Sequence, residues 1–252
     1  MKRKIINMEE VDSTNRFLHD YTPETDEEMT IVTARFQTAG RGQGSNRWES
    51  KAGANLLFSL LVHPVRVPLM FRFLLSEAGA LALKEALDSY TDGIRIKWPN
   101  DIYWQDRKIS GTLIETRVSG GSLKDFIFGC GVNVNQTEFV SDAPNPVSLR
   151  QIIGRRVPPE ELLGRITEAF DKYYGMVIDR QYADIAARYD EALYRRHGFF
   201  PYRDQNGDFE GAIVEVEDDG HLVLRDRSDA LRRYAFKEIE YILPPQEKPS
   251  CL

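Results

Sequence analysis

Cysteine is scarce in this sequence of 252 residues, which contains only two. Cys130 lies in an apolar stretch flanked by glycines, and Cys251 is next to the last residue. Two cysteines so far apart match no metal-ligand spacing, and they argue against a disulfide framework. We therefore interpret both as reduced thiols, which are typical of a protein in a reducing compartment.

Long hydrophobic runs are missing as well. No apolar stretch approaches the roughly 20 residues that a helix needs to cross a bilayer. The segment Met1–Lys4 is basic, but no apolar segment follows it before Glu9 and Glu10, which argues against a signal peptide. We therefore expect a cytoplasmic protein without a membrane partner. The chain is long enough to bury a core without disulfides or structural metal.

The sequence also has no excess of positive charge. It contains 33 lysines and arginines against 39 aspartates and glutamates, which gives a formal net charge of −6. Bulk electrostatics therefore do not favour a nucleic acid as partner. A binding site for anions has to be a local concentration of cations.

The pattern of residue types predicts a main α+β domain over residues 1–197 and a small all-β domain over residues 198–252. Short apolar or alternating runs predict the strands, at about residues 30–36, 54–62, 94–98, 102–104, 108–116, 126–135 and 234–243. A further hairpin is expected where alternating runs at 213–216 and 222–224 flank an Asp-Asp-Gly turn. Apolar residues at helical spacing predict the helices, which begin near residues 14, 68 and 159, with helix continuing to about residue 196.

The segment Thr38–Trp48 (TAGRGQGSNRW) is rich in glycine and polar residues. Glycine lets backbone amides approach a ligand closely, and successive amides form concavities that bind anions. Arg41 adds a planar donor fork suited to carboxylate or phosphate. Because such a loop loses much entropy on ordering, we expect it to close only over a bound ligand. A solvated surface loop is the alternative, and Trp48 could stack on a purine or belong to the core.

A second segment gathers polar residues at a proline turn between two apolar strands. It reads Lys97–Ile102 (KWPNDI) and is followed by Lys108–Glu115 (KISGTLIE). Asn100 and Asp101 are suitable ligands for Mg²⁺ together with the phosphates of ATP. Lys108 lies at the start of a strand, where its ammonium could reach a carboxylate and a phosphoryl oxygen together. A solvated turn lysine is the alternative.

A third segment, Gly129–Asn135 (GCGVNVN), would let a ligand lie against bare backbone, unless its glycines only allow close sheet packing. Five segments thus occur in a fixed order: Asp12-Ser13-Thr14-Asn15, Gln37-Thr38-Ala39-Gly40-Arg41-Gly42, Lys97-Trp98-Pro99-Asn100-Asp101, Lys108-Ile109-x-Gly111 and Gly129-x-Gly131-Val132-Asn133. Together they resemble the biotin–protein ligases, also called holocarboxylase synthetases, over about residues 8–136.

The resemblance implies an activity and a fold. The activity is ATP-dependent formation of biotinyl-5′-AMP, followed by transfer of biotin to a lysine of a biotin carboxyl carrier protein domain, with ATP, biotin and Mg²⁺ required. The fold is a mixed β-sheet flanked by helices, like that of class II aminoacyl-tRNA synthetases. A small C-terminal Src-homology-3-like β-barrel would follow, over residues from about 198 onward.

The resemblance also assigns residues to roles. Lys108 matches the essential lysine of the family, and we expect it to act with Arg41 on the biotin carboxylate and the α-phosphate. The residues implied in biotin binding are Ser13, Thr14, Asn15, Gln37, Gly40, Arg41, Gly42, Gln43, Lys108, Gly111, Gly129 and Gly131. The residues implied in ATP binding are Arg47, Trp48, Asn100, Asp101 and Asn133, with Asp101 also a candidate Mg²⁺ ligand.

The glycine-rich loop departs from the usual pattern of the family, Gly-Arg-Gly-Arg-x-Gly-Arg-x-Trp. Gln43 stands at the second arginine position and Asn46 at the third. Loop closure and retention of the adenylate are the properties that these replacements bring into question. Arg47 is placed to supply part of the missing charge.

Three alternative functions are compatible with parts of this pattern. A lipoate–protein ligase would run the same two steps on another acid, but the segments at 40–42 and 97–101 favour biotin. A bifunctional ligase and DNA-binding repressor would need a helix-turn-helix domain, for which the 11 residues before Asp12 are too few, so we expect no DNA binding. A catalytically silent biotin-binding module is disfavoured by the presence of Lys108 and Asp101. Whether the protein is a monomer or a homodimer stays open.

Overall fold

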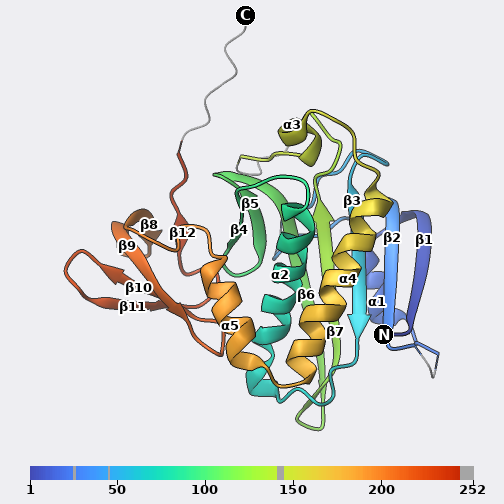
Figure 1. Cartoon of the computed structure of the whole chain (residues 1–252), viewed down its shortest axis with the longest axis horizontal. Helices are drawn as coiled ribbons and strands as arrows, with labels where there is room; N and C mark the ends of the chain where they lie inside the picture. The colour runs from blue at the N-terminus through green and yellow to red at the C-terminus, as the bar shows by residue number, and fades with distance from the viewer. Residues whose placement is uncertain (25–26, 45, 141–144, 245–252) are drawn as a thin grey trace, which may run out of the picture.

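A computed structural model describes residues 1–24, 27–44, 46–140 and 145–244. A seven-stranded sheet forms its larger part (Figure 1). In spatial order its strands are β1 (Arg3–Val11), β2 (Met29–Gln37), β3 (Leu56–Val62), β7 (Ser122–Val132), β6 (Arg107–Ser119), β5 (Asp101–Trp104) and β4 (Ile94–Lys97). β1 and β2 are parallel, and the other neighbours are antiparallel. The predicted mixed sheet is therefore confirmed.

Helices cover both faces of this sheet (Figure 1). Of the described helices, α1 (Thr14–Asp20), α2 (Phe73–Asp88) and α4 (Pro159–Ile178) lie over the sheet. The others are the 3₁₀ turn η1 (Leu69–Phe71), α3 (Leu149–Ile153) and α5 (Tyr182–Glu191). β3 is buried throughout and serves both faces, because successive side chains of a strand point in opposite directions. Its residues Phe58 and Leu60 belong to the main core with α2 and α4, whereas Leu61 packs with Leu18 of α1.

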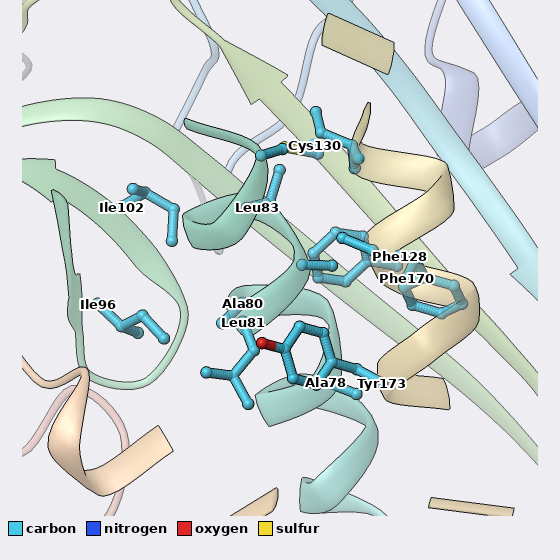
Figure 2. Packing of buried hydrophobic residues seen from close by; sticks show 14 of the residues in the cluster. Ala78, Ala80, Leu81, Leu83, Ile96, Ile102, Phe128, Cys130, Phe170 and Tyr173 are labelled. Atoms are coloured by element: carbon cyan, nitrogen blue, oxygen red, sulfur yellow. The ribbon is translucent and has the colours of Figure 1, made fainter. Parts of the chain in front are cut away.

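Helix α2 lies close to the sheet because Gly79 faces it. A Cβ atom at Gly79 would lie 2.4 Å from Cε2 of Phe128, so only glycine fits without movement. Figure 2 shows Phe128 of β7 near Phe170 of α4, and the two ring centroids are 6.3 Å apart. This packing fixes α2 and α4 over the half of the sheet that carries β7 and β6.

The C-terminal part is a second sheet of five antiparallel strands. In spatial order these are β11 (Leu231–Tyr234), β10 (Leu222–Asp226), β9 (Gly207–Val216), β8 (Phe200–Asp204) and β12 (Glu240–Tyr241). The predicted hairpin at 213–224 is confirmed as β9 and β10. Within the described residues the sheet is open, because its edge strands β11 and β12 do not pair, so the expected barrel is not confirmed.

Several element boundaries differ from the expectations, and left-handed residues explain two of them. The strand expected at 234–243 is wrong, because a turn with Lys237 at φ 74° separates β11 from β12. The helix expected from 159 to 196 is interrupted after Ile178, where Arg180 has φ 61°, and α5 ends at Glu191. A single residue with positive φ cannot continue either a strand or a helix.

Other differences concern strand bounds and elements for which the sequence has no clear local pattern. The strand expected at 126–135 begins at Ser122 and ends at Val132. Strand β1 was not predicted, since it carries many charged residues and lies at the edge of the sheet, where most of its side chains are not buried. The short elements β8 and α3 were missed too. None of the described helices has the length and apolar character needed to span a membrane.

The two sheets meet at β4 and the turn that follows it. The indole Nε1 of Trp98 donates to the backbone oxygen of Gly220 at 3.0 Å, and its ring contacts Phe236 edge-on with centroids 6.0 Å apart. Nζ of Lys97 lies 4.4 Å from the ring centroid of Tyr241. Residues of the second sheet are thereby held beside the Lys97–Asp101 segment.

Glu77 of α2 is a buried carboxyl near this junction. Only 3% of its surface is exposed, and its Oε2 atom has no hydrogen-bond partner in the described residues. Burial, and then the negative charges of Asp218 and Asp190, raises the pKa of Glu77 to about 8. Glu77 is therefore protonated at neutral pH in the folded protein.

We expect the buried Glu77 to make the folded protein less stable as the pH rises from about 5 to about 8. The unfolded chain releases the proton near the ordinary pKa of 4.5, whereas the folded chain keeps it until about 8. The unfolded state therefore binds fewer protons in this range and gains stability, by on the order of 4 kcal/mol in total. Glu77→Gln removes the effect, so urea midpoints of the variant should exceed those of the wild type increasingly between pH 5 and 8. A constant difference between the two proteins would contradict the assignment.

Candidate active site

A cavity of about 1010 Å³ opens between the seven-stranded sheet, the glycine-rich loop and the second sheet. All of the site residues expected from the sequence line it except Gly40: Ser13, Thr14, Asn15, Gln37, Arg41, Gly42, Gln43, Arg47, Trp48, Asn100, Asp101, Lys108, Gly111, Gly129, Gly131 and Asn133. Gly40 is buried at the base of the loop instead, where its carbonyl accepts a hydrogen bond from the Trp48 amide at 3.1 Å. Residues from five separate segments thus meet in one space.

The cavity is rich in positive charge although the whole chain is acidic. The cationic side chains that line it are Arg41, Arg47, Arg72, Lys97 and Lys108, and the carboxylates are Glu49, Asp101 and Asp219. Cations outnumber carboxylates here, whereas the chain as a whole carries a net charge of −6. This is the local concentration of cations that an anion site requires.

One wall of the cavity is polar and comes from the start of α1. Ser13 caps this helix by accepting from the Arg16 amide, and the amide of Thr14 donates to Oε1 of Gln37 at 2.8 Å. The hydroxyl of Ser59 in β3 lies 2.7 Å from Oγ1 of Thr14. These side chains offer donors and acceptors to a small polar ligand inside an otherwise apolar sheet.

Asn15 is held in a single position on this wall. Its Nδ2 atom donates to the carbonyl of Leu113 at 3.1 Å and to Oε2 of Glu115 at 2.9 Å, and the Ser59 hydroxyl donates to its Oδ1 atom at 2.6 Å. Its side chain lies directly over Gly129, where an added Cβ atom would be 1.9 Å from Oδ1. Glycine at 129 is therefore required for the observed position of Asn15.

Arg41 and Lys108 approach the cavity from different elements. A guanidinium nitrogen of Arg41, in the loop, lies 3.6 Å from a carboxylate oxygen of Glu115 in β6. Nζ of Lys108, at the start of β6, donates to Oδ2 of Asp101 at 2.6 Å, and both side chains are about a quarter exposed. An ammonium has three N–H donors, so Lys108 can bind a ligand anion while it keeps Asp101.

Trp48 forms the inner surface of the loop. Its ring packs on the bare backbone of β6 and β7, since a Cβ atom at Gly131 would lie 2.3 Å from Cε2 and one at Gly111 would lie 2.9 Å from Cζ3. The loop itself is a short hairpin in which the Gly42 amide donates to the Asn46 carbonyl at 2.8 Å. The indole Nε1 of Trp48 is buried without a hydrogen-bond partner in the described residues, so it is available to an acceptor on a ligand.

The chain is similar to known proteins over much of its length. Residues 8–133, half of the chain, match the Biotin/lipoate A/B protein ligase family. The chain belongs to this family. A biotin–[acetyl-CoA-carboxylase] ligase of Paracoccus denitrificans is 33% identical over 208 residues, which are 77% of this chain and 83% of that protein. The bifunctional ligase/repressor BirA of Bacillus subtilis is 28% identical over 249 residues, covering 95% of this chain and 74% of BirA.

Solved structures of biotin protein ligases have the same fold. The biotin protein ligase of Aquifex aeolicus in complex with biotin and ATP aligns with a TM-score of 0.77 and 24% identity, over 95% of this chain and 99% of that one. That of Leishmania major in complex with biotin aligns with a TM-score of 0.65 and 24% identity, over 92% and 98%. The mixed α+β architecture is therefore that of the ligase family.

Some residues that line this ligase-type cavity were not assigned from the sequence. Lys97 is one of them, and burial, with the nearby charges of Lys108 and Arg195, lowers its pKa. Glu115 pairs with Arg41 but does not line this cavity, and its place in the Lys108–Glu115 segment did not by itself predict a role. Ser59 does not line the cavity but supports its polar wall. The sequence could have indicated this residue, because it is the polar residue in an otherwise apolar strand.

The second sheet also contributes to the cavity, and no sequence signal indicated this. Its lining residues are Asp219, Gly220, His221, Ala235 and Phe236. Among the described residues, one group with metal-ligand spacing is Glu217, Asp219 and His221. Both of its carboxylates are paired with Arg233, at 2.5 and 2.6 Å, so an arginine already neutralises them. Cys130 is a buried free thiol, and Cys251 lies outside the described residues.

Proposed function

We propose that the chain is a biotin–protein ligase that joins biotin to ATP as biotinyl-5′-AMP and then passes biotin to a lysine of a biotin carboxyl carrier protein domain. The observation that carries the proposal is the single cavity in which the polar wall, the glycine-rich loop and the Lys108–Asp101 pair meet. Its volume of about 1010 Å³ is at the upper end of the range for one small ligand, which suits two ligands bound together.

The first step brings two anions together. A carboxylate oxygen of biotin attacks the α-phosphorus of ATP, the bond from that phosphorus to the β-bridging oxygen breaks, and pyrophosphate leaves. Lys108 and Arg41 bind the carboxylate and the α-phosphate, so their charges offset the repulsion and stabilise the transition state. The amides of the loop add donors to the phosphate oxygens.

Biotin is proposed to lie on the polar wall, and the nucleotide nearer the loop and the second sheet. Ser13, Thr14, Asn15 and Gln37 offer hydrogen bonds to the head group of biotin. The glycines at 111, 129 and 131 let Trp48 and Asn15 lie close to the strands, and they thereby shape the space proposed for biotin. Trp48 and Asn133 are assigned to the adenine, and Arg47 to the phosphates. The unpartnered Nε1 of Trp48 supports a ligand at this point.

The fit of a magnesium ion rests on two side chains. Asp101 uses one carboxylate oxygen for Lys108, and Asn100 donates through Nδ2 to Ser76 at 3.4 Å, which leaves its amide oxygen as a ligand. Mg²⁺ needs few protein ligands when phosphate oxygens complete its shell. Asn100 and Asp101 would hold it, and it would neutralise charge on the leaving pyrophosphate.

In the second step a lysine amine of the carrier domain attacks the carbonyl carbon of the mixed anhydride. AMP leaves with the bonding electrons, and the amine loses a proton. The closed loop keeps water from the anhydride in the meantime. We further propose that residues 198–252 are the counterpart of the small C-terminal β-barrel and cover the nucleotide side of the catalytic domain, residues 1–197.

Loop closure gives a testable prediction. Saturating biotin together with ATP is expected to protect residues 38–48 from limited proteolysis, because contacts between the ligands and the loop oppose the local opening that cleavage requires. Mass spectrometry of the fragments locates the cleavage sites. The exposed turn at Gly120-Gly121 lies outside the cavity and serves as the control. It should be cut equally with and without the ligands. Unchanged cleavage in residues 38–48 would count against closure.

The proposed activity is tested by mass spectrometry of a biotin carrier domain incubated with this protein, ATP, Mg²⁺ and biotin. We expect one biotinyl group on one lysine of the carrier. Replacing biotin by lipoate is the discriminating arm, and modification with lipoate alone would make the protein a lipoate ligase. Exchange of labelled pyrophosphate into ATP tests the first step by itself, and its absence would indicate a silent binding module.

A further inference from the structure

Lys237 lies in the turn between β11 and β12 and has an unusual backbone. Its φ of 74° is in the left-handed region, which glycine adopts readily and a lysine rarely does. Its neighbours Ala235 and Phe236 line the cavity. A lysine at this position, beside the ligand site, strains the backbone more than a glycine would. A function of the Lys237 side chain would explain why a lysine is present here.

The ammonium of Lys237 reaches the glycine-rich loop. A Cβ atom built on Gly44 would lie 2.5 Å from Nζ of Lys237 and 3.9 Å from its Cε. The second sheet and the loop thus touch through one lysine and one glycine. Within the described residues the structure records no ion pair for Lys237, so its charge faces the loop backbone without a counter-ion.

The loop itself has few cations at this end. Gln43 and Asn46 are neutral, and Arg41 already faces Glu115 at 3.6 Å. The backbones of Arg41 and Arg47 pair across the loop hairpin, and both residues line the cavity. A nucleotide triphosphate carries several negative charges, and it needs positive charge on the side where the loop meets the second sheet. Lys237 is the side chain that brings an ammonium to that boundary.

We propose that Lys237 binds phosphate oxygens of the nucleotide from the second sheet when the glycine-rich loop is closed. Its ammonium replaces charge that the loop lacks at Gln43, and an anion bound there adds to the contact that Lys237 already makes with Gly44. This inference rests on the proposed ligase function. Its chemistry is that of phosphate, whether in the triphosphate of ATP or in the bound adenylate.

The test uses Lys237→Gly, because glycine keeps the left-handed backbone while the ammonium is removed. The matched control is Arg180→Gly, which also removes one exposed cation from a left-handed position, φ 61°, but whose neighbours in the chain do not line the cavity. Lys237→Arg keeps the charge. Biotin-dependent pyrophosphate exchange measures KM for ATP and kcat, and the release of labelled biotinyl-AMP measures retention of the adenylate.

We expect Lys237→Gly to raise KM for ATP, or to speed release of biotinyl-AMP, by about tenfold, the value of one charge-assisted hydrogen bond. A change in KM alone assigns the contact to the triphosphate, and a change in release alone assigns it to the adenylate. Lys237→Arg should recover most of the effect, and Arg180→Gly should stay within about twofold of the wild type.

The wild-type protein distinguishes a failure of the Lys237 proposal from a failure of the proposed ligase function. If the wild type exchanges pyrophosphate and Lys237→Gly is within about twofold of it in both measurements, Lys237 is not a phosphate ligand. If the wild type itself shows no biotin-dependent exchange, the proposed ligase function fails first.

Urea midpoints of the two glycine variants should equal or exceed that of the wild type, since both substitutions remove a side chain from a left-handed backbone position. A lower midpoint for Lys237→Gly alone would assign Lys237 a structural role and overturn the proposal.

Discussion

Lys108→Ala is expected to lower biotin-dependent pyrophosphate exchange by about a thousandfold or more. Removing a charge that acts on the developing negative charge of a transition state costs several kcal/mol in barrier height. The loss should fall mainly on kcat, because Arg41, Arg47 and the loop amides still bind the substrates. Exchange assays with labelled pyrophosphate at saturating ATP and biotin measure the effect.

Two further variants test whether the loss of exchange in Lys108→Ala comes from the missing ammonium itself. Lys124→Ala removes an exposed lysine of β7 that does not line the cavity, and it should leave exchange unchanged. Lys108→Ala also leaves Asp101 without its partner at 2.6 Å, so Lys108→Ala/Asp101→Asn shows whether that unpaired carboxylate contributes. Near-normal exchange in Lys108→Ala would remove this residue from the role proposed for it.

Gly129→Ala is expected to have the second large effect, on both stability and biotin binding. The new methyl group would lie 1.9 Å from Oδ1 of Asn15, which is held by Ser59, Leu113 and Glu115 and cannot move without breaking those hydrogen bonds. We expect the free energy of unfolding to fall by about 2 kcal/mol. Biotin affinity, measured by calorimetry, should fall with it, because the polar wall is displaced.

A matched glycine and a double variant test this explanation. Gly164→Ala, on an exposed face of α4 with no atom within 4 Å of the added methyl, should raise stability by about 0.5 to 1 kcal/mol. Gly129→Ala/Asn15→Ala gives the methyl group space, so stability should recover relative to Gly129→Ala while biotin binding stays weak. If the double variant is no more stable than Gly129→Ala, the clash with Asn15 is not the cause.

Local patterns predicted much of the main domain. β3 and α2 were found because an apolar run of strand length and a helical apolar spacing need no partner to be recognised. β1 was missed because its charged residues hide an edge strand, which only its pairing with β2 reveals. The strand expected over 234–243 failed at Lys237, since no local pattern indicates that a lysine will adopt positive φ.

The candidate site divides in the same way. Its residue types and their order were readable, since glycines, arginines and the Lys97–Asp101 segment stand out against ordinary loops. The sequence did not show that these residues meet in one cavity. They are brought together by pairing between strands that are separated in the sequence, as where Gly111 lies beside Gly131. The contribution of Phe236 and its neighbours had no signal, as it depends on how the second sheet packs on Trp98.

The amino-acid sequence alone determined which chemistry this protein has available: few cysteines, a glycine-rich loop with arginines, and a lysine beside an aspartate, at spacings shared with one ligase family. Tertiary structure alone decided which charges face each other across the cavity. Arg41 beside Glu115 and Lys108 beside Asp101 are examples, and the position of Asn15 over Gly129 shows that steric fit is decided in the same way. The physical reason is that residue types and local periodicity are properties of short segments, whereas electrostatics and steric fit depend on distances that only the packed chain sets.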